Sequence, residues 1–420
     1  MTKLSPDLQS RDRNLAICPP ACPPACPPVR LTIVQYGDYA EAAARFQAGG
    51  AANYYAQRYT VDFVARLAAM PGTERVGVIS FAADLPEVLT QNGVHTSGVD
   101  LYPQGRRPRV KELLAAIAAT RPTHLVIGAP IAPAIRWGIR ARLPVLPLFA
   151  DSFHGSGLKG YIRARMLAWL LNRPAIEYVA NHNLAASLDL ARIGVARDKI
   201  LPFDWPEMTS AQDYSAKPAP APDRPFRLLY VGQLTEAKGV GDAVRALAIL
   251  RHRGLDATLT LVGTGDNEDL VALALAQGVS QEVTLAGLLP HHQVLAEMRA
   301  HDVVLVPSRH DYPEGMPMTI YEALCVRTPL VVSDHPMFAL RIHDGQQALV
   351  HPQRNPGAMA ERIERLATDP QTYEAFSRQA ETAVQDYLCP LKWDRLLEDF
   401  LHPATRKALG RYSLARYSYF

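Results

Sequence analysis

The sequence predicts an α/β protein built from two doubly wound domains, and three observations carry this prediction. Short runs rich in β-branched residues alternate with longer runs of helical periodicity, which is typical of a mostly parallel sheet covered by helices on both faces. The alternation occurs twice and is interrupted by a proline-rich segment. The length of 420 residues is enough for two cores of ordinary size, and no apolar run approaches the roughly 20 residues of a membrane-spanning helix.

Residues 1–29 form a segment of low complexity. Cys18–Pro28 reads C-P-P-A-C-P-P-A-C-P-P, and its prolines favour an extended backbone, so we expect a disordered tail. Three cysteines without a fourth ligand nearby favour low complexity over a metal site. The same residues lack the basic start, apolar stretch and cleavage site of a secretory signal, so we expect a cytoplasmic protein.

The first domain is expected over residues 30–206. Its predicted strands are Leu31–Gln35, Val76–Ser80, Leu125–Ile127, Val145–Phe149 and Tyr178–Ala180. Helical periodicity falls between them, as in Tyr55–Ala68 and Val110–Ala119. Strand followed by helix, repeated, indicates a parallel sheet that binds ligands at the carboxyl ends of its strands.

Residues 207–225 contain K-P-A-P-A-P-D-R-P and are expected to form a stiff linker. The second domain is expected over residues 226–385, with Val240–Arg251 as one of its helices. Its predicted strands are Arg227–Val231, Thr258–Val262, Val283–Leu285, Val303–Val306 and Leu330–Ser333. Residues 386–420 are expected to add a C-terminal helix and a basic, aromatic tail.

The formal net charge of +3 is divided unevenly along the chain. Residues 1–215 carry +6 and the remaining residues carry −3. Between Leu113 and Ile176, eight basic residues accompany a single acidic residue, Asp151. The first domain therefore has a basic stretch that would attract an anionic partner. No nucleic-acid recognition motif accompanies these basic residues, so we do not expect nucleic-acid binding.

The turn after the first strand of the second domain has the residues of a diphosphate site. V-G-Q-L-T-E-A-K-G, over residues 231–239, leads into a predicted helix. Gly232 permits close backbone approach, the helix N-terminus offers unpaired N–H groups, and Lys238 adds a positive charge. An ordinary surface lysine beside a tight turn is the alternative. The next strand ends in Gly263-Thr264-Gly265, which by itself indicates only a turn.

A second motif, P-E-G-M-P-M-T-I-Y-E-A-L over residues 313–324, carries two glutamates. Glu314 lies in a loop after a predicted strand, and Glu322 lies at the predicted start of a helix. Carboxylates accept paired hydrogen bonds from vicinal hydroxyls, which both ribose and hexoses offer. Two ordinary solvated acids are the alternative.

Together these motifs resemble the family 4 retaining glycosyltransferases of GT-B fold, the glycosyl transferases group 1, from Phe226 to about Leu366. The resemblance implies two Rossmann-like domains facing across a cleft, an N-terminal acceptor-binding domain and a C-terminal nucleotide-sugar-binding domain. It also implies a retaining, metal-independent hexosyltransferase that has no cofactor and uses a UDP- or GDP-linked sugar as co-substrate.

Catalytic roles follow from the resemblance for three residues. Glu314 would hold the donor sugar and Lys238 would neutralise the diphosphate. His154, in a loop after a predicted strand, is the third candidate, as a contact to the sugar or the transition state. Glycosyl transfer develops negative charge on the departing diphosphate, and a lysine beside it would stabilise that charge.

Binding roles follow in the same way. Glu322 would bind the ribose hydroxyls and Leu288 would lie near the base through its backbone. The full set of donor-binding candidates is Glu322, Gly232, Gln233, Gly265, Leu288, Gly315, Met316 and Pro317. Gly49 and Gly50 resemble the early glycine loop of the family, which would approach the phosphates.

Two positions depart from the family. Gln233 stands where arginine is usual, so one of two phosphate-neutralising cations is absent. Arg327 stands where a glycine commonly follows the helix of the second glutamate, and both a structural role and an altered donor pocket are open.

The first domain is expected to select the acceptor. In Gly160–Arg173 one helical face holds Ile162, Met166, Trp169 and Leu170. Arg163 and Arg165 border that face, so Arg163, Arg165 and Trp169 are candidates for contact with an anionic membrane or the acceptor. The alternative is a face that packs against its own domain.

We therefore expect a transferase at the inner face of the membrane that acts on a lipid-linked glycan or glycolipid in polysaccharide or envelope biosynthesis. Two alternatives stay open: a glycosyltransferase of a soluble small molecule or secondary metabolite, and a non-catalytic GT-B protein that binds nucleotide-sugar or serves as a scaffold. The sequence predicts no oligomeric state.

Overall fold

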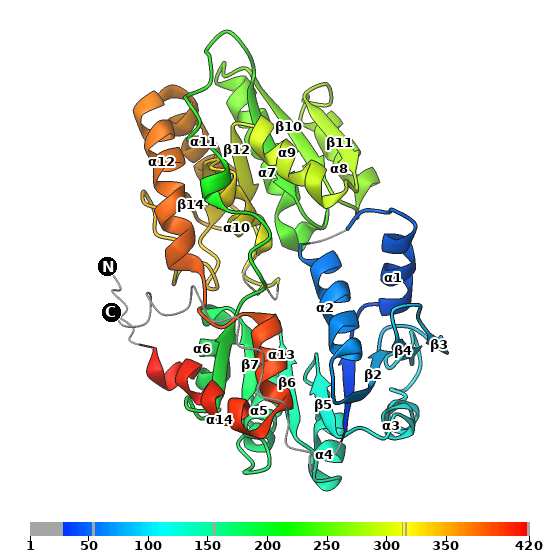
Figure 1. Ribbon diagram of the computed structural model, residues 1–420. Coiled ribbons are helices and arrows are strands. Elements are labelled where there is room, and N and C mark those ends of the chain that lie inside the picture. The colour runs from blue at the N-terminus through cyan, green and yellow to red at the C-terminus, as the bar shows by residue number, and fades with distance from the viewer. Residues whose placement is uncertain (1–27, 53–54, 154–156, 313, 316, 418–420) are drawn as a thin grey trace. The chain divides into compact units, whose positions relative to one another are not determined.

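The computed structural model describes residues 28–52, 55–153, 157–312, 314–315 and 317–417 (Figure 1). The chain divides into two compact units. The first comprises the described residues up to Gly50, Arg58–Trp205 and those from Cys389 onward; the second comprises Ala51–Gln57 and Pro206–Leu388. The cysteines of the Cys-Pro-Pro-Ala repeat lie outside the described residues.

The first unit is built on an eight-stranded sheet of order β3-β4-β2-β1-β5-β6-β7-β8. Its strands are β1 (Val29–Gln35), β2 (Thr73–Ser80), β3 (Leu85–Leu89), β4 (Val94–Gly98), β5 (His124–Ile127), β6 (Val145–Phe149), β7 (Val179–His182) and β8 (Ile200–Phe203). Neighbouring strands pair in parallel, except that β3 runs antiparallel to β4.

The helices of this unit come from three separate parts of the chain. They are α1 (Tyr39–Gln47), α2 (Gln57–Ala69), α3 (Val110–Ala119), α4 (Ala132–Arg140), α5 (Gly157–Leu171), α6 (Leu184–Arg192), α13 (Trp393–Leu401) and α14 (Pro403–Ala408). The first residue of α2, Gln57, is counted with the second unit.

Continuous apolar runs explain the central strands of the first sheet. All five residues of β6 are buried, as a parallel strand covered on both faces requires. The five strands predicted for this domain are confirmed. β3, β4 and β8 are absent from the prediction. Of these, β3 and β8 contain Pro86 and Pro202 and lie at the two edges of the sheet, where proline is tolerated. β1 begins at Val29, inside the segment expected to be a tail.

The second unit is built on a six-stranded sheet of order β11-β10-β9-β12-β13-β14, in which every pair is parallel. Its strands are β9 (Phe226–Val231), β10 (Ala257–Val262), β11 (Val283–Gly287), β12 (Val303–Val306), β13 (Leu330–Ser333) and β14 (Leu349–His351). Its helices are α7 (Val240–His252), α8 (Asn267–Ala276), α9 (His291–Ala300), α10 (Met318–Cys325), α11 (Pro356–Thr368) and α12 (Pro370–Tyr387).

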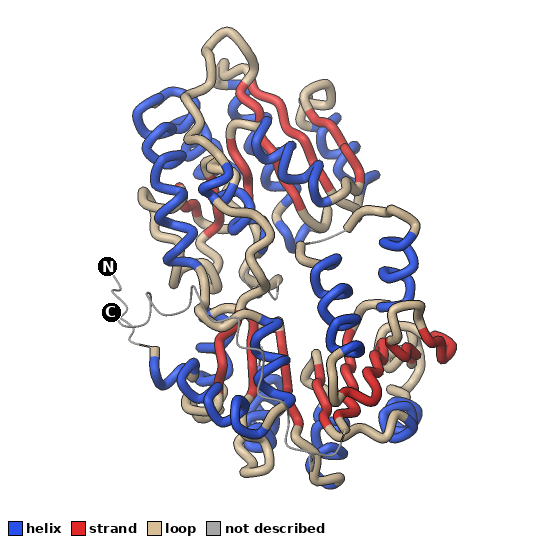
Figure 2. Tube along the Cα trace, viewed as in Figure 1, coloured by secondary structure: helices blue, strands red, loops and turns tan. Residues whose placement is uncertain are grey.

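The core of the second unit forms around β9. Leu228 and Tyr230 of this strand are buried in one cluster with Val244 and Leu247 of α7. Figure 2 shows helices packed around the red strands of each unit. The five strands predicted for this domain are confirmed, and the two parallel-sheet α/β domains are as expected.

The division into units differs from the expected contiguous one at three places, the first being Ala51–Gln57, which is counted with the second unit. The proline-rich segment lies against the second unit, because the Lys217 ammonium donates to the Arg299 carbonyl at 2.8 Å and its amide donates to Ser377 Oγ at 2.6 Å. The residues after Leu388 return to the first unit. There the Asp204 amide, just after β8, donates to the Leu391 carbonyl at 3.0 Å.

The described part of the C-terminal tail packs on the first unit as two turns of 3₁₀-helix, Leu409–Tyr412 and Leu414–Arg416. Leu409 and Leu414 are fully buried, and the Ala415 amide donates to the Arg197 carbonyl at 3.1 Å. The tail therefore completes the fold of this unit. Among the described residues, no helix combines the length and the apolar character needed to span a membrane.

Candidate functional site

The candidate site of the second unit lies at the carboxyl ends of β9 and β12. These strands are neighbours although β10 follows β9 in the chain, so the strand order reverses between them. Open parallel sheets bind ligands at such a switch point. Gly232 and Gln233 follow β9, and Ser308 and Glu314 follow β12.

Lys238 and Glu314 form the central ion pair of this edge. The Lys238 Nζ atom lies 2.6 Å from Glu314 Oε1, and the side chains are 17% and 6% exposed. The Ser308 hydroxyl donates to the same oxygen at 2.5 Å. Among the described residues no donor reaches Glu314 Oε2, so this oxygen is left as an acceptor for a ligand. The structure thus brings together two of the three predicted catalytic residues.

Arg309 fixes the turn that carries Lys238. Its guanidinium donates to Asp242 at 3.0 and 3.1 Å and forms an ion pair with Glu236 at 2.6 Å. Its amide donates to the Ala237 carbonyl at 3.0 Å. Lys238 ends the 3₁₀ turn Glu236–Lys238, which precedes α7. Sequence reasoning missed Arg309, although its position just after β12 could have pointed to it.

Gln233 has a partner that the sequence did not predict. The Tyr312 hydroxyl donates to Gln233 Oε1 at 3.2 Å. The Tyr312 ring lies under the Lys238 ammonium, 4.2 Å from Nζ to the ring centroid. Burial raises the pKa of Tyr312, so its hydroxyl remains a donor at neutral pH.

Glu322 is buried, with 5% of the residue exposed. The prediction that it begins a helix is wrong, because α10 begins at Met318, where backbone hydrogen bonding starts after Pro317. Its Oε1 lies 2.5 Å from His291 Nε2. Burial raises the pKa of Glu322, and the His291 bond opposes that shift. No pattern in the sequence pointed to His291, which only the packing of α9 brings to this carboxylate.

The glycines after β9 and β10 allow two backbone segments to approach closely. A Cβ atom at Gly263 would lie 1.8 Å from the Gly232 carbonyl oxygen, and one at Gly265 would lie 2.4 Å from that of Leu234. Gly263 and Gly265 have φ values of +143° and +151°. The structure therefore gives these residues a structural reason to be glycine, beside the predicted role of Gly232 and Gly265 in donor binding.

The remaining donor-binding candidates surround the same strand ends. Leu288 follows β11 and is 59% exposed. Gly315 and Pro317 lie between Glu314 and α10 and are partly buried. Met316 and the catalytic candidate His154 lie outside the described residues. In the first unit, Gly49 and Gly50 follow α1, and Gly49 has a φ of +79°.

Arg327 is a structural residue. It has a φ of +58°, in the left-handed region that favours glycine after a helix. Its side chain donates to the Ala211 carbonyl at 2.8 Å and forms an ion pair with Glu381 at 2.5 Å. These contacts hold the linker and α12, so of the two open roles the structure supports the structural one.

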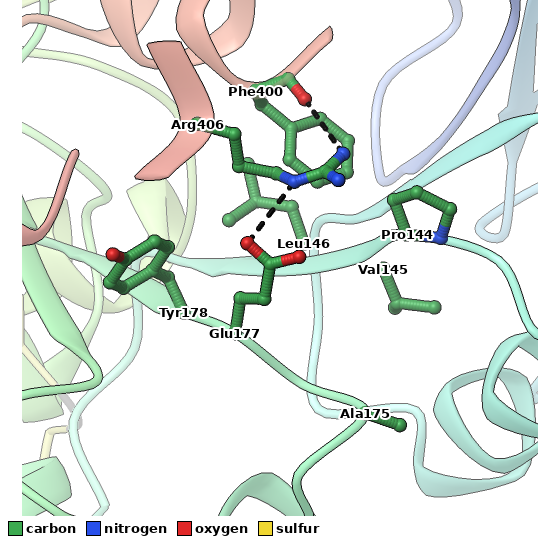
Figure 3. A pocket seen from close by; sticks show the side chains of 8 residues that line it. All are labelled: Pro144, Val145, Leu146, Ala175, Glu177, Tyr178, Phe400 and Arg406. Atoms are coloured by element: carbon green, nitrogen blue, oxygen red, sulfur yellow. Dashed lines mark hydrogen bonds and ion pairs between the residues drawn. The ribbon is translucent and has the colours of Figure 1, made fainter. Parts of the chain in front are cut away.

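A small pocket of the first unit lies at the opposite ends of the strands (Figure 3). Among its lining residues, Pro144 precedes β6, Val145 is the first residue of β6, and Glu177 and Tyr178 precede β7. The Arg406 guanidinium of α14 donates to Glu177 at 3.2 Å within it. Ligands of parallel sheets bind at the carboxyl ends, so this pocket is not a candidate active site.

Helix α5 presents a large apolar surface. Five large apolar residues in it are more than 45% exposed: Leu158, Tyr161, Ile162, Met166 and Trp169. The prediction that Leu170 shares this face is wrong, because Leu170 packs into the unit with 3% exposed. Arg163 and Arg165 are both exposed, and Arg165 donates to the Ile193 carbonyl at 3.0 Å. The guanidinium of Arg173 lies 4.9 Å from the Trp169 ring centroid.

Residues 212–383 match the family model described as glycosyl transferases group 1. The match covers the sheet of the second unit and less than half of the chain.

Relatives and solved structures agree with that match. The chain is 35% identical over 159 residues to the alpha-D-kanosaminyltransferase of Streptomyces kanamyceticus, covering 38% of this chain and 40% of the relative. It is 28% identical over 187 residues to the amylovoran biosynthesis glycosyltransferase of Erwinia amylovora, covering 44% and 42%. The chain thus spans less than half the length of these relatives.

The crystal structure of HepE from Anabaena in complex with UDP aligns with a TM-score of 0.62 at 15% identity, covering 85% of this chain and 95% of that chain. This likeness extends over both parallel-sheet domains. The fold is therefore the two-domain α/β fold of the GT-B glycosyltransferases.

Proposed function

We propose that this protein is a glycosyltransferase that moves a sugar from a UDP- or GDP-linked donor to an acceptor. One observation carries the proposal: two buried carboxylates, Glu314 and Glu322, lie at the β9–β12 edge with Lys238 bound to one of them. This is the sheet edge at which nucleotides bind in doubly wound folds. The group 1 match over residues 212–383 and the GT-B fold support the same activity.

In the proposed mechanism the Glu322 carboxylate accepts hydrogen bonds from the ribose hydroxyls, and Glu314 Oε2 accepts hydrogen bonds from hydroxyls of the donor sugar. Negative charge develops on the diphosphate as its bond to the sugar breaks, and the Lys238 ammonium stabilises that charge. A lysine here supplies the positive charge that a divalent cation supplies in other transferases, so we propose a metal-independent reaction.

We further propose that the reaction retains the anomeric configuration. The leaving phosphate oxygen would accept the proton of the attacking acceptor hydroxyl on the same face of the sugar. This route needs no separate general base. Proton NMR of the glycoside product reports the configuration of the new bond, and an inverted product would refute this step.

Thermal-shift measurements with UDP, GDP and their sugar conjugates test donor binding. A ligand that binds the folded state raises Tm. At 100 times its Kd it adds about 2.7 kcal/mol to the free energy of unfolding. Glu314→Ala and Lys238→Ala should abolish donor-dependent transfer, whereas Glu374→Gln, at an exposed ion pair of α12, should leave it unchanged. Unchanged transfer in both site variants would exclude the proposed site.

We propose that the acceptor is a lipid-linked glycan or glycolipid and that α5 contacts an anionic bilayer at the inner membrane face. The five exposed apolar residues of α5 fall within an arc of about 140° at 100° per residue. Arg163 and Lys159 are exposed on the same helix, and Arg136 and Arg140 are exposed on α4. Apolar insertion combined with charge complementarity fits an anionic lipid surface.

Co-sedimentation with vesicles of phosphatidylglycerol and of phosphatidylcholine tests this contact. We expect stronger binding to the anionic vesicles and loss of binding in Met166→Glu plus Trp169→Glu. Leu275→Glu on α8, where Leu275 is 70% exposed, is the matched control and should bind as the wild type does. Equal partition of all three proteins between the two vesicle types would refute a membrane role for α5.

A soluble small-molecule acceptor is the second candidate, and the match to a kanosaminyltransferase favours it. Transfer to a soluble acceptor without vesicle binding would support it. A non-catalytic nucleotide-sugar-binding protein is the third, because Gln233 removes one expected cation. Donor hydrolysis by the purified protein would exclude this third candidate.

A further inference from the structure

The buried carboxylate of Glu322 has a protein partner already in place. His291, the first residue of α9, brings Nε2 to within 2.5 Å of Glu322 Oε1. The side chains are 18% and 6% exposed, so the contact is largely shielded from water. Among the described residues no hydrogen bond reaches Glu322 Oε2. One oxygen is thus held by the protein and the other is left for a ligand.

The imidazole is held from its other sides. The His291 amide donates to the Ala52 carbonyl at 3.1 Å, and the Tyr55 ring meets the imidazole edge-on at 5.7 Å between centroids. Tyr55 is itself fixed, because its hydroxyl donates to the Pro206 carbonyl at 2.7 Å and accepts from the Met208 amide at 2.8 Å. The imidazole cannot turn away without loss of this packing.

A carboxylate must be ionised to accept both hydroxyls of a ribose, and burial works against ionisation. Burial raises the pKa of Glu322, and the hydrogen bond and charge of His291 lower it. The other titratable groups around the pair are Tyr55, Tyr321 and Cys325. Burial raises the pKa of both tyrosines and raises that of Cys325 to about 12, so all three stay neutral between pH 5 and 9.

We propose that His291 is a positioning residue of the donor site, which holds the Glu322 carboxylate oriented and ionised for the vicinal hydroxyls of the donor's ribose. This inference rests on the proposed function. His291 acts through Glu322 and makes no contact with the transferred sugar. Its loss therefore weakens ribose recognition and leaves the chemical step at saturating donor nearly unchanged.

Titration calorimetry of the full chain tests the proposal, with UDP and GDP as probes and the tighter one carried forward. His291→Leu removes the donor, His291→Gln keeps an N–H group, and His292→Leu is the matched control because His292 is exposed beside it. Loss of one charge-assisted hydrogen bond should weaken nucleotide binding by about tenfold or more in His291→Leu. His291→Gln should recover most of the affinity, and His292→Leu should bind as the wild type does.

The 2′-deoxy form of the same nucleotide provides the specific readout. The wild type should bind the deoxy form about tenfold more weakly, because Glu322 then loses a hydroxyl partner. In His291→Leu this discrimination should fall to about threefold or less. The loss of binding at low pH should also begin at a higher pH in His291→Leu, because the Glu322 carboxyl then protonates more easily. The phosphate of the nucleotide titrates equally in all variants and cancels in the comparison.

The outcomes separate the two levels of inference. A wild type that binds neither nucleotide would overturn the proposed function itself. A wild type that binds, together with a His291→Leu variant that has the same affinity, deoxy discrimination and pH profile, would overturn the role of His291 alone. Circular dichroism of each variant identifies a misfolded protein, and His291→Gln then provides the comparison.

Discussion

Replacing Lys238 by methionine should destabilise the second unit as well as abolish donor binding. Glu314 is 5% exposed. In Lys238→Met the Ser308 hydroxyl would be the remaining hydrogen-bond donor to the buried Glu314 carboxylate among the described residues. Breaking a fully buried pair by removing one partner costs about 3–5 kcal/mol. Because Lys238 is 17% exposed, water screens part of this cost, and we expect about 2–3 kcal/mol.

For a unit of this size that loss corresponds to a fall in Tm of about 4–12 °C. The double variant Lys238→Met plus Glu314→Gln removes both charges, so its stability should return to within about 1 kcal/mol of the wild type. The resulting coupling energy is then about 2 kcal/mol. Arg378→Met is the matched control, because its pair with Glu374 is exposed and worth less than about 1 kcal/mol.

Differential scanning calorimetry measures each Tm with and without UDP and GDP. Lys238→Met and the double variant should lose the nucleotide-induced rise in Tm, even though the double variant regains stability. This separates the structural cost of the buried charge from its role in binding. A Tm of Lys238→Met within about 1 °C of the wild type would refute a buried ion pair that stabilises this unit, and so would losses of the two single variants that add in the double variant.

Three further predictions concern pH, backbone conformation and charge. Burial and the nearby Arg406 lower the pKa of His124 from 6.5 to about 4, so the free energy of unfolding should fall by up to about 3 kcal/mol as the pH falls from 6.5 to 4. Urea unfolding should show this loss in the wild type and a weaker dependence of stability on pH in His124→Gln. Gly239→Ala should lower the free energy of unfolding by at least about 2 kcal/mol more than Gly278→Ala. Both glycines have φ near +73°, but only a Cβ at Gly239 would meet a backbone oxygen, that of Pro307 at 2.1 Å. Equal urea midpoints of the two variants would contradict this. Gln233→Arg should tighten UDP binding by about tenfold or more in calorimetry, because it adds a charged donor beside the diphosphate; unchanged affinity would place position 233 away from the phosphates.

The strands could be predicted from the sequence because their signal is local. β6 and β12 are short apolar runs that are buried on both faces, and no distant residue is needed to identify them. β3, β4 and β14 could not be predicted in this way, because none of them contains a run of three apolar residues. β8 is an apolar run, but a proline inside a strand is usual only at a sheet edge, and the sequence alone does not show that β8 lies at one.

The candidate site was predictable where a residue follows a strand end, and not where packing alone brings it there. Lys238 and Glu314 follow β9 and β12, so the topology of the sheet places them together. His291 reaches Glu322 from α9, 31 residues away in the chain, and only the packing of α9 and α10 creates that contact. On α5 the apolar period was visible in the sequence, but the burial of Leu170 depends on the unit beneath it.

The absence of arginine at position 233 changes how a diphosphate would be bound. Arg309 cannot take its place, because Asp242 and Glu236 already engage its guanidinium. Lys238 is shared with Glu314, so an incoming phosphate would not meet an unpaired lysine. Backbone N–H groups would then supply a larger share of the binding beside Lys238, and these are dipoles rather than free charges. Donor affinity should therefore fall less with salt than it would in a site built on two exposed cations, because screening weakens interactions between full, solvent-exposed charges most.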